Sequence, residues 1–174
     1  DESADQLTAL VGNLLDSSRL QAGVVRPTLT PIYVEDAVQR ALSSSSTQTS
    51  SSVAQVSVDV GDVQVLADFG LLERVLANLV DNSVRHGLGS DIRIGALSRG
   101  DRASITVADR GPGVDRDAEQ SMFDAFQRLG DRNATVGVGL GLSVVRGFVE
   151  AMGGSVDASE TPGGGLTVTI DLAA

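Results

Sequence analysis

The chain has 174 residues, a formal net charge of −10, one histidine and no cysteine, and all 13 of its basic residues are arginines. This length suits one domain with a short appendage. The absence of cysteine excludes disulfides and thiolate metal sites, and the single His86 excludes a histidine-rich metal site. An acidic chain without tryptophan or a basic stripe is a poor candidate for nucleic-acid binding. The sequence contains no run of about 18 apolar residues, so it predicts no membrane-spanning helix.

An amphipathic helix is predicted for residues 5–20. Its apolar side chains recur at three- and four-residue spacing, at Leu7, Leu10, Val11, Leu14 and Leu15. This stripe has no apolar partner nearby in the sequence, which favours packing in a helical bundle with another chain. Docking on the following domain is the alternative. Residues 21–23 end the helix, and Pro27 and Pro31 bracket a short extended piece.

The next segments predict a helix, a loop and a β-hairpin. The helix is expected at residues 32–42, and the serine-rich run at 43–52 is expected to be a flexible loop because it can bury little. A phosphorylation tract is the less favoured interpretation of this run. Val56, Val58 and Val60 alternate as in a strand. A turn at 61–62 would lead into a second strand at 63–67.

A helix with two asparagines on one face follows. Asp68 can cap its start, and Gly87 can supply a left-handed end. Asn78 and Asn82 are four residues apart, so they share a face, and Arg85 and His86 follow within a turn; the apolar face is formed by Leu72, Val75, Leu76, Leu79, Val80 and Val84. Half-buried amides need partners that an apolar core does not offer. A metal–phosphate ligand is one interpretation, and a hydrated surface stripe is the other.

Two more hairpins and a helix complete the predicted fold. Strands are expected at 92–96 and 103–109, and again at 155–159 and 166–172, with a helix at 140–152 between the two hairpins. The predicted fold is therefore α+β: a two-layer sandwich of a mixed, mostly antiparallel sheet with helices on one face.

Two glycine-containing segments are candidates for ligand binding. Asp109 follows a strand directly and is backed by Gly111 and Gly113, so its carboxylate could accept a hydrogen bond from the amino group of a base; a β-turn explains the same residue types. Residues 135–142 run into a helix whose N-terminal N–H groups can bind an anion. Their spacing is not that of a P-loop, and no strand immediately precedes them, so a P-loop or a Rossmann fold is disfavoured.

In this order the motifs resemble the C-terminal part of a bacterial sensor histidine kinase with a GHKL-type ATP-binding domain. The boxes of that family correspond to residues 78–86 (N box), 109–113, 123–126 (F box), 137–141 and 163–165. Residues 7–23 resemble the second helix of the dimerisation domain, and the segments around 126–133 and 162–170 are most similar to KdpD-type potassium-response kinases. The resemblance implies a dimerisation helix at 1–23, a catalytic domain at 24–174 and an ATP lid at about 123–139.

The resemblance also implies ATP and Mg²⁺ as ligands. Asn82 would coordinate Mg²⁺ and Asn78 would hold phosphate or metal-bound water. Arg85, where lysine is usual, would meet the phosphates as a fork, so that Asn78 and Arg85 take part in catalysis. Asp109 would accept from the adenine amino group. The other predicted nucleotide-binding residues are His86, Gly111, Gly113, Arg128, Arg132, Gly137, Gly139, Leu140, Gly141 and Thr167. Leu166 stands where threonine is common.

The implied activity is donation of the γ-phosphate of ATP to a histidine, for relay to an aspartate of a response regulator. In this family the acceptor lies upstream, so these residues are expected to bind ATP without autophosphorylation. They would form the cytoplasmic part of a membrane-anchored bacterial protein, homodimeric through the N-terminal helix and without direct membrane insertion. Hydrolysing relatives carry an acid at the position of Asn78, and an amide is a poor general base, which favours transfer over hydrolysis. The alternatives are an anti-sigma-type GHKL serine kinase and a non-catalytic nucleotide-binding switch.

Overall fold

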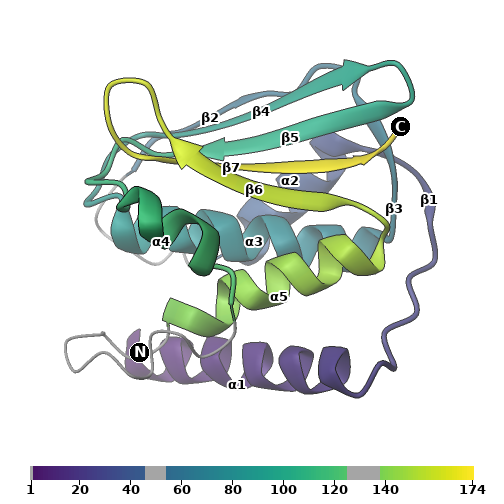
Figure 1. Ribbon diagram of the computed structural model, residues 1–174, viewed down its shortest axis with the longest axis horizontal. Helices are drawn as coiled ribbons and strands as arrows, with labels where there is room; N and C mark the ends of the chain where they lie inside the picture. The colour runs from purple at the N-terminus through teal and green to yellow at the C-terminus, as the bar shows by residue number, and fades with distance from the viewer. Residues whose placement is uncertain (1, 46–53, 125–137) are drawn as a thin grey trace.

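The computed structural model describes residues 2–45, 54–124 and 138–174. Figure 1 shows three layers: the large sheet, a layer of helices beneath it, and a further helix beneath those. The middle layer contains the helices α2 (Val34–Ser44), α3 (Phe69–His86) and α5 (Val138–Ala151). The lowest helix, α1 (Glu2–Gln21), lies against α5 and does not lie on the sheet. The apolar core fills the space between the sheet and the middle layer.

The large sheet has the strand order β2-β4-β5-β7-β6. Its strands are β2 (Val56–Asp59), β4 (Ile92–Arg99), β5 (Arg102–Ala108), β6 (Ser155–Glu160) and β7 (Leu166–Ala173). β2 and β4 are parallel, and the other neighbours are antiparallel. Alternate residues of β7 are buried, as the twofold period of a strand requires. The two predicted hairpins after residue 90 and the mostly antiparallel sheet are confirmed.

The predicted hairpin between residues 56 and 67 is wrong. β3 (Gln64–Ala67) pairs with β1 (Thr30–Tyr33) in a separate two-stranded sheet, while β2 pairs with β4. Alternation in a sequence identifies the buried face of a strand but not its partner. Here the chain from β2 passes through β3 and α3 before it returns beside β2 as β4, which is the long connection that a parallel pair requires.

Several predicted boundaries also shift. The helix expected at 32–42 begins at Val34, because Thr30–Tyr33 is used as a strand. Its end extends through Ser43 and Ser44 into the serine-rich run, and residues 46–53 lie outside the described residues. A short helix, α4 (Arg116–Ser121), lies in a segment for which the sequence predicted no helix or strand. α5 begins at Val138, two residues before the predicted start.

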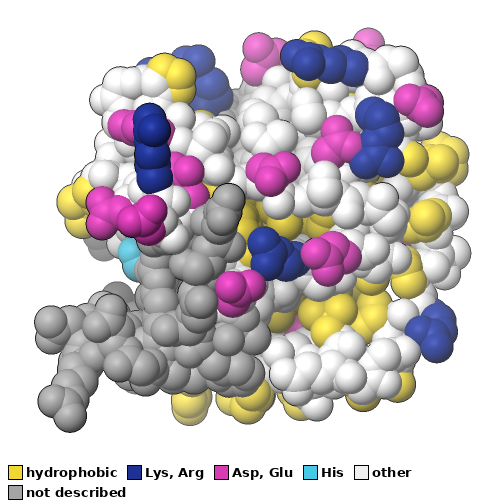
Figure 2. Space-filling model, in the orientation of Figure 1, with side chains coloured by type: hydrophobic (Ala, Val, Ile, Leu, Met, Phe, Trp, Pro, Cys, Tyr) yellow, Lys and Arg dark blue, Asp and Glu magenta, His cyan; other side chains and the backbone are white. Residues whose placement is uncertain are grey.

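The predicted N-terminal helix is confirmed, but its apolar stripe is not the side that packs on the domain. Four of the five stripe residues are exposed, at 62% for Leu7, 47% for Val11, 50% for Leu14 and 57% for Leu15, and Leu10 is half-buried. Figure 2 shows apolar side chains along the lower edge of the molecule, where α1 lies. In this single chain α1 docks on the domain, and the bundle with another chain stays a prediction.

Candidate functional site

Helix α3 carries the asparagines to one end of the domain. Its start is fixed by Asp68, whose Oδ1 accepts from Leu71 N (3.2 Å) and whose Oδ2 accepts from Thr28 N (2.9 Å). The apolar face of the helix is buried under the sheet. Because the helical period separates the two faces, Asn78 and Asn82 lie outside this core, on a half-buried side of the helix.

The two asparagines meet the first turn of α5 at a small cavity of about 40 Å³. A Cβ placed on Gly141 would lie 3.9 Å from Asn78 Oδ1. The residues that line the cavity are Ala9, Asn13, Asn78, Asp81, Asn82, Arg85, His86, Gly141 and Leu142. The structure therefore brings together the predicted N box and the last glycine of the second glycine box.

The amide nitrogen of Asn78 is the group in this cavity that most clearly indicates a ligand-binding site. Asn78 Nδ2 is buried and has no hydrogen-bond partner in the described chain. Buried polar groups are normally paired, so an orphaned donor at this place needs an acceptor. A phosphate oxygen or a metal-bound water fits that donor, and the amide oxygens of the two asparagines fit Mg²⁺, which prefers oxygen ligands. A purely hydrated stripe, the alternative interpretation, does not account for a donor shielded from solvent.

Asp109 is held at the end of β5 as a fixed acceptor. The residue is 3% exposed, and its Oδ1 accepts from Gly111 N (3.0 Å) and from Leu166 N (3.2 Å). Its Oδ2 makes no hydrogen bond with the described residues. The Asp109 side chain forms an Asx-type turn, because Oδ1 accepts from the N–H of Gly111, two residues on. The same carboxylate keeps one oxygen for another partner.

Threonine is common at the position of Leu166, but the contact that this residue makes to Asp109 uses its backbone N–H and not its side chain. The N–H fixes Asp109, and the Leu166 side chain is buried in the core. The neighbouring Thr167 pairs with Ala108 in the sheet register, next to Asp109. Its hydroxyl lies 2.9 Å from that of Thr161, so the two hydroxyls share a hydrogen bond.

The glycines near Asp109 allow backbone segments to approach one another. A Cβ on Gly111 would lie 2.7 Å from Gly87 Cα, and one on Gly113 (φ +71°) would lie 3.2 Å from Gly165 O. A Cβ on Gly165 (φ +115°) would overlap the carbonyl oxygen of Asp109. The first and third glycine boxes are thus packed directly against each other, which holds Asp109 in place.

The predicted left-handed helix end at Gly87 is wrong. Gly87 has φ −74°, and the positive φ angles fall on Leu88 (52°) and Gly89 (77°). A Cβ on Gly87 would overlap the carbonyl oxygen of Ser83 and lie 2.9 Å from Ser90 Oγ. Glycine is required at this position because the Ser83 carbonyl and the Ser90 side chain lie too close for a Cβ, and not because the backbone is left-handed.

Some predicted site residues are placed differently or are not described. Phe126, Arg128, Arg132 and Gly137 lie outside the described residues. Gly139 and Leu140 lie in the first turn of α5, since the helix begins at Val138. Among the described residues no cluster of three or more acidic, histidine or cysteine side chains is placed to hold a metal. Likewise, no described helix has the length and apolarity to cross a membrane.

Four functional candidates escaped the sequence interpretation. Ala9 and Asn13 of α1 line the cavity together with Asn78 and Asn82. The two pairs lie more than 60 residues apart in the chain, so no local sequence pattern indicates that they meet. Asp81 is adjacent to Asn82 and could have been found from helical spacing. Arg146 of α5 donates to Asp124 Oδ1 (3.0 Å), and its guanidinium carbon lies 5.3 Å from the ring centroid of the buried Phe123.

The sandwich fold, the paired asparagines and the fixed Asp109 define an ATPase domain of the GHKL type. The family of histidine kinase-, DNA gyrase B- and HSP90-like ATPases matches residues 67–174, and the chain belongs to this family.

Comparison with individual proteins places the chain near the sensor kinases. It is 58% identical over 178 residues to the sensor protein KdpD of Mycobacterium tuberculosis, covering 100% of this chain and 21% of that protein. The KdpD of Escherichia coli is 36% identical over 166 residues, covering 95% of this chain and 18% of that protein. The structure of full-length ShkA in complex with AMPPNP matches with a TM-score of 0.80 and 31% identity, over 99% of this chain and 37% of that chain. The chain thus spans about a fifth of the length of these KdpD relatives, and the predicted resemblance to KdpD-type sensor kinases is confirmed.

Proposed function

We propose that this chain is the ATP-binding catalytic part of a sensor histidine kinase. It donates the γ-phosphate of ATP to a histidine on a dimerisation domain, for relay to an aspartate of a response regulator. The observation that carries the proposal is the meeting of Asn78 and Asn82 with the first turn of α5, where Asn78 Nδ2 is buried without a hydrogen-bond partner among the described residues. The similarity to KdpD and to ShkA, which was solved with AMPPNP, supports it.

The base and the phosphates of the nucleotide each have partners in this proposal. Asp109 Oδ2 accepts from the adenine amino group, since Oδ1 is already used by two backbone N–H groups. Asn82 Oδ1 would hold Mg²⁺, and the ion would neutralise part of the phosphate charge. Asn78 Nδ2 donates to a phosphate oxygen or a metal-bound water, and the N–H groups of the first turn of α5 face the phosphates.

The same residues favour transfer over hydrolysis. A water molecule needs a general base to attack phosphorus, and the Asn78 amide cannot serve as one. In the transfer step an imidazole nitrogen of the acceptor forms a bond to the γ-phosphorus. The bond from this phosphorus to the bridging oxygen breaks, ADP leaves, and the imidazole N–H proton goes to solvent. The single histidine of the chain, His86, lines the nucleotide cavity, so the acceptor belongs to another segment.

We also propose a division of the chain at residue 23. Residues 1–23 belong to a dimerisation helix, and residues 24–174 form the catalytic domain, with a lid at about 123–139. α1 ends at Gln21, Gly23 has φ +66°, and an extended segment follows, which supports a boundary at this place. Homodimerisation through α1 is consistent with the exposed apolar stripe on that helix.

Calorimetric titration of ATP with and without Mg²⁺ tests the site. We expect saturable binding of magnesium-ATP to the parent, and loss of the Mg²⁺-dependent part of the affinity in Asn82→Ala. Gln39→Ala is the matched control, because it removes an amide from an exposed position of another helix. A parent without saturable binding, or Asn82→Ala with the parent's Mg²⁺ dependence, would overturn the proposed site. Transfer itself is tested by adding a histidine-bearing dimerisation domain in trans and following acid-labile phosphate on it.

A further inference from the structure

The side of α1 that contacts the domain is its polar and small side. Ala9, Gly12, Asn13, Asp16 and Leu20 are partly or fully buried there, while the apolar stripe points away. Interfaces between domains of one chain are often polar in this way, and relative motion across them is common. The composition of this contact therefore favours a reversible dock over a permanent one.

One ion pair connects the middle of α1 to α3. Asp16 Oδ2 accepts from Arg74 Nε (2.7 Å) and lies 2.6 Å from Arg74 Nη2. The Asp16 side chain is 12% exposed, whereas that of Arg74 is 46% exposed. A Cβ on Gly12 would lie 2.8 Å from Arg74 Nη2, so glycine makes room for the guanidinium. If Asp16 loses its charge, water can hydrate the half-exposed Arg74 side chain in its present position. The ATPase domain itself then loses little stability.

A second contact lies near the C-terminal end of α1. A Cβ on Gly147 of α5 would lie 2.5 Å from Leu20 Cδ1, so the two helices approach closely only because this residue is glycine. Glycine inside a helix costs about 1 kcal/mol relative to alanine. The close approach of α1 provides a physical reason for glycine in the interior of α5.

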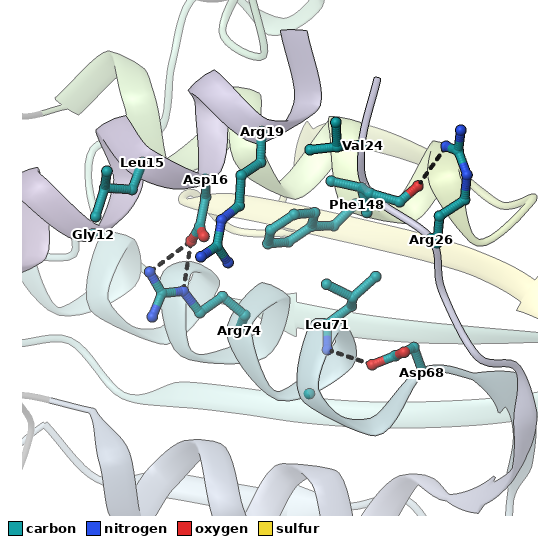
Figure 3. A pocket seen from close by; sticks show the side chains of 12 residues that line it. Gly12, Leu15, Asp16, Arg19, Val24, Arg26, Asp68, Leu71, Arg74 and Phe148 are labelled. Atoms are coloured by element: carbon teal, nitrogen blue, oxygen red, sulfur yellow. Dashed lines mark hydrogen bonds and ion pairs between the residues drawn. The ribbon is translucent and has the colours of Figure 1, made fainter. Parts of the chain in front are cut away.

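The space around these contacts is not filled. A cavity of about 690 Å³ lies between α1, the following segment, α3 and α5. Figure 3 shows Arg74 reaching from α3 to Asp16 on one side of it, with Phe148 of α5 on the other. Protein cores normally leave few voids larger than a water molecule. The docked α1 is therefore held by a few contacts and not by a continuous core.

The first half of α1 covers the phosphate end of the nucleotide site. Ala9 and Asn13 line the cavity with Asn78 and Asn82, and Asn13 Nδ2 lies 3.6 Å from a Cβ placed on Gly141. The remaining volume is about 40 Å³. A buried water needs at least about 10–15 Å³ of such space, so the cavity holds only a few waters. It does not suit Mg²⁺ together with phosphate groups.

We infer that docked α1 is a latch that competes with magnesium-ATP for the phosphate end of the site. The inference rests on the proposed function of that site. The Asp16–Arg74 pair and the Leu20–Gly147 contact hold the latch closed, and Ala9 and Asn13 occupy space that the phosphates need. Because coupling between two binding equilibria is reciprocal, bound magnesium-ATP must weaken the docking of α1 by the same factor.

Three variants of the same chain test the latch. Asp16→Asn removes the charge of the ion pair, and Gly147→Ala places a methyl group against Leu20. Leu14→Ala is the matched control, since it alters an exposed position of α1 on the opposite side. In calorimetric titrations we expect both latch variants to bind magnesium-ATP at least about 5-fold more tightly than the parent. Leu14→Ala should bind as the parent does, and adenosine, which lacks phosphates, should bind all four proteins equally.

Hydrogen exchange of residues 9–20 supplies a second measurement on the parent chain. Saturating magnesium-ATP should increase exchange in this segment, while adenosine should not. Unchanged exchange, or latch variants that bind magnesium-ATP no more tightly than the parent, would overturn the latch and leave the proposed function intact. Weaker binding by both variants would overturn it too, because α1 would then complete the site. If the parent and every variant fail to bind magnesium-ATP, the proposed function fails together with the latch.

Discussion

Replacing Asp109 with asparagine should separate base recognition from stability. In the parent, Oδ1 accepts two backbone N–H groups, and Oδ2 is left for the adenine amino group. An asparagine can keep its Oδ1 in the first role, but its Nδ2 would then face the adenine amino group, donor against donor. We therefore expect the variant to fold and to bind ATP poorly.

The expected loss can be worked out from these contacts. A hydrogen bond to a charged group contributes about 1.5–3 kcal/mol, and an unsatisfied buried donor costs about 1–3 kcal/mol. Their sum is at least about 2.5 kcal/mol, or roughly a 60-fold loss of affinity for magnesium-ATP. The two backbone bonds become neutral and weaken but remain, so the free energy of unfolding should fall by no more than about 2 kcal/mol.

Calorimetry with ATP and GTP measures both the affinity and the base preference. Guanine carries a carbonyl oxygen where adenine carries its amino group, so the new Asn donor should reduce the preference for ATP over GTP. Asp171→Asn is the matched control, because it makes the same chemical change on the exposed side of the sheet, where Asp171 pairs with Arg102. An Asp109→Asn protein with the parent's affinity and preference would refute the assigned role of this carboxylate.

Three further substitutions test other parts of the molecule. Gly165→Ala forces a side chain into a positive-φ position against a backbone carbonyl, so it should destabilise the fold by about 2 kcal/mol or more, seen as a lower Tm; an unchanged Tm contradicts this packing. Asn78→Asp supplies a base beside the phosphates and should increase phosphate release from ATP, and a rate equal to the parent's argues against that geometry. Arg146→Met removes the contacts to Asp124 and Phe123 and should lower the free energy of unfolding by about 1 kcal/mol in urea titrations, whereas no change would mean that these contacts are negligible.

Much of the fold could be predicted because its information is local. The helical period separated the buried face of α3 from Asn78 and Asn82, and alternation located the strands of the last two hairpins. The order of the boxes along the chain identified the family. For the helix and the hairpins, the relevant residues lie within one element or in adjacent ones, so a repeat in the sequence is enough to place them.

Other features depend on contacts between distant segments. The partner of β2, the close approach at Gly87 and the packing of Gly113 against Gly165 all depend on backbone segments that meet only in the folded chain. The periodicity of apolar residues does not indicate which distant backbone segment will lie next to a given strand or glycine.

The sequence by itself determined the long helices, the last two hairpins and the residue types of the site, which are an amide pair, an acid and a set of glycines, because each is encoded by spacing along one stretch. Only the tertiary structure decided which side of α1 faces the domain. An apolar stripe was the natural candidate, yet Asn13 and Asp16 lie inward and Leu14 lies outward. The reason is physical: Arg74 of α3 offers Asp16 a charged partner, and Gly147 of α5 offers Leu20 a close approach. Neither partner is near α1 in the sequence, so the side that α1 buries emerges only from the assembled fold.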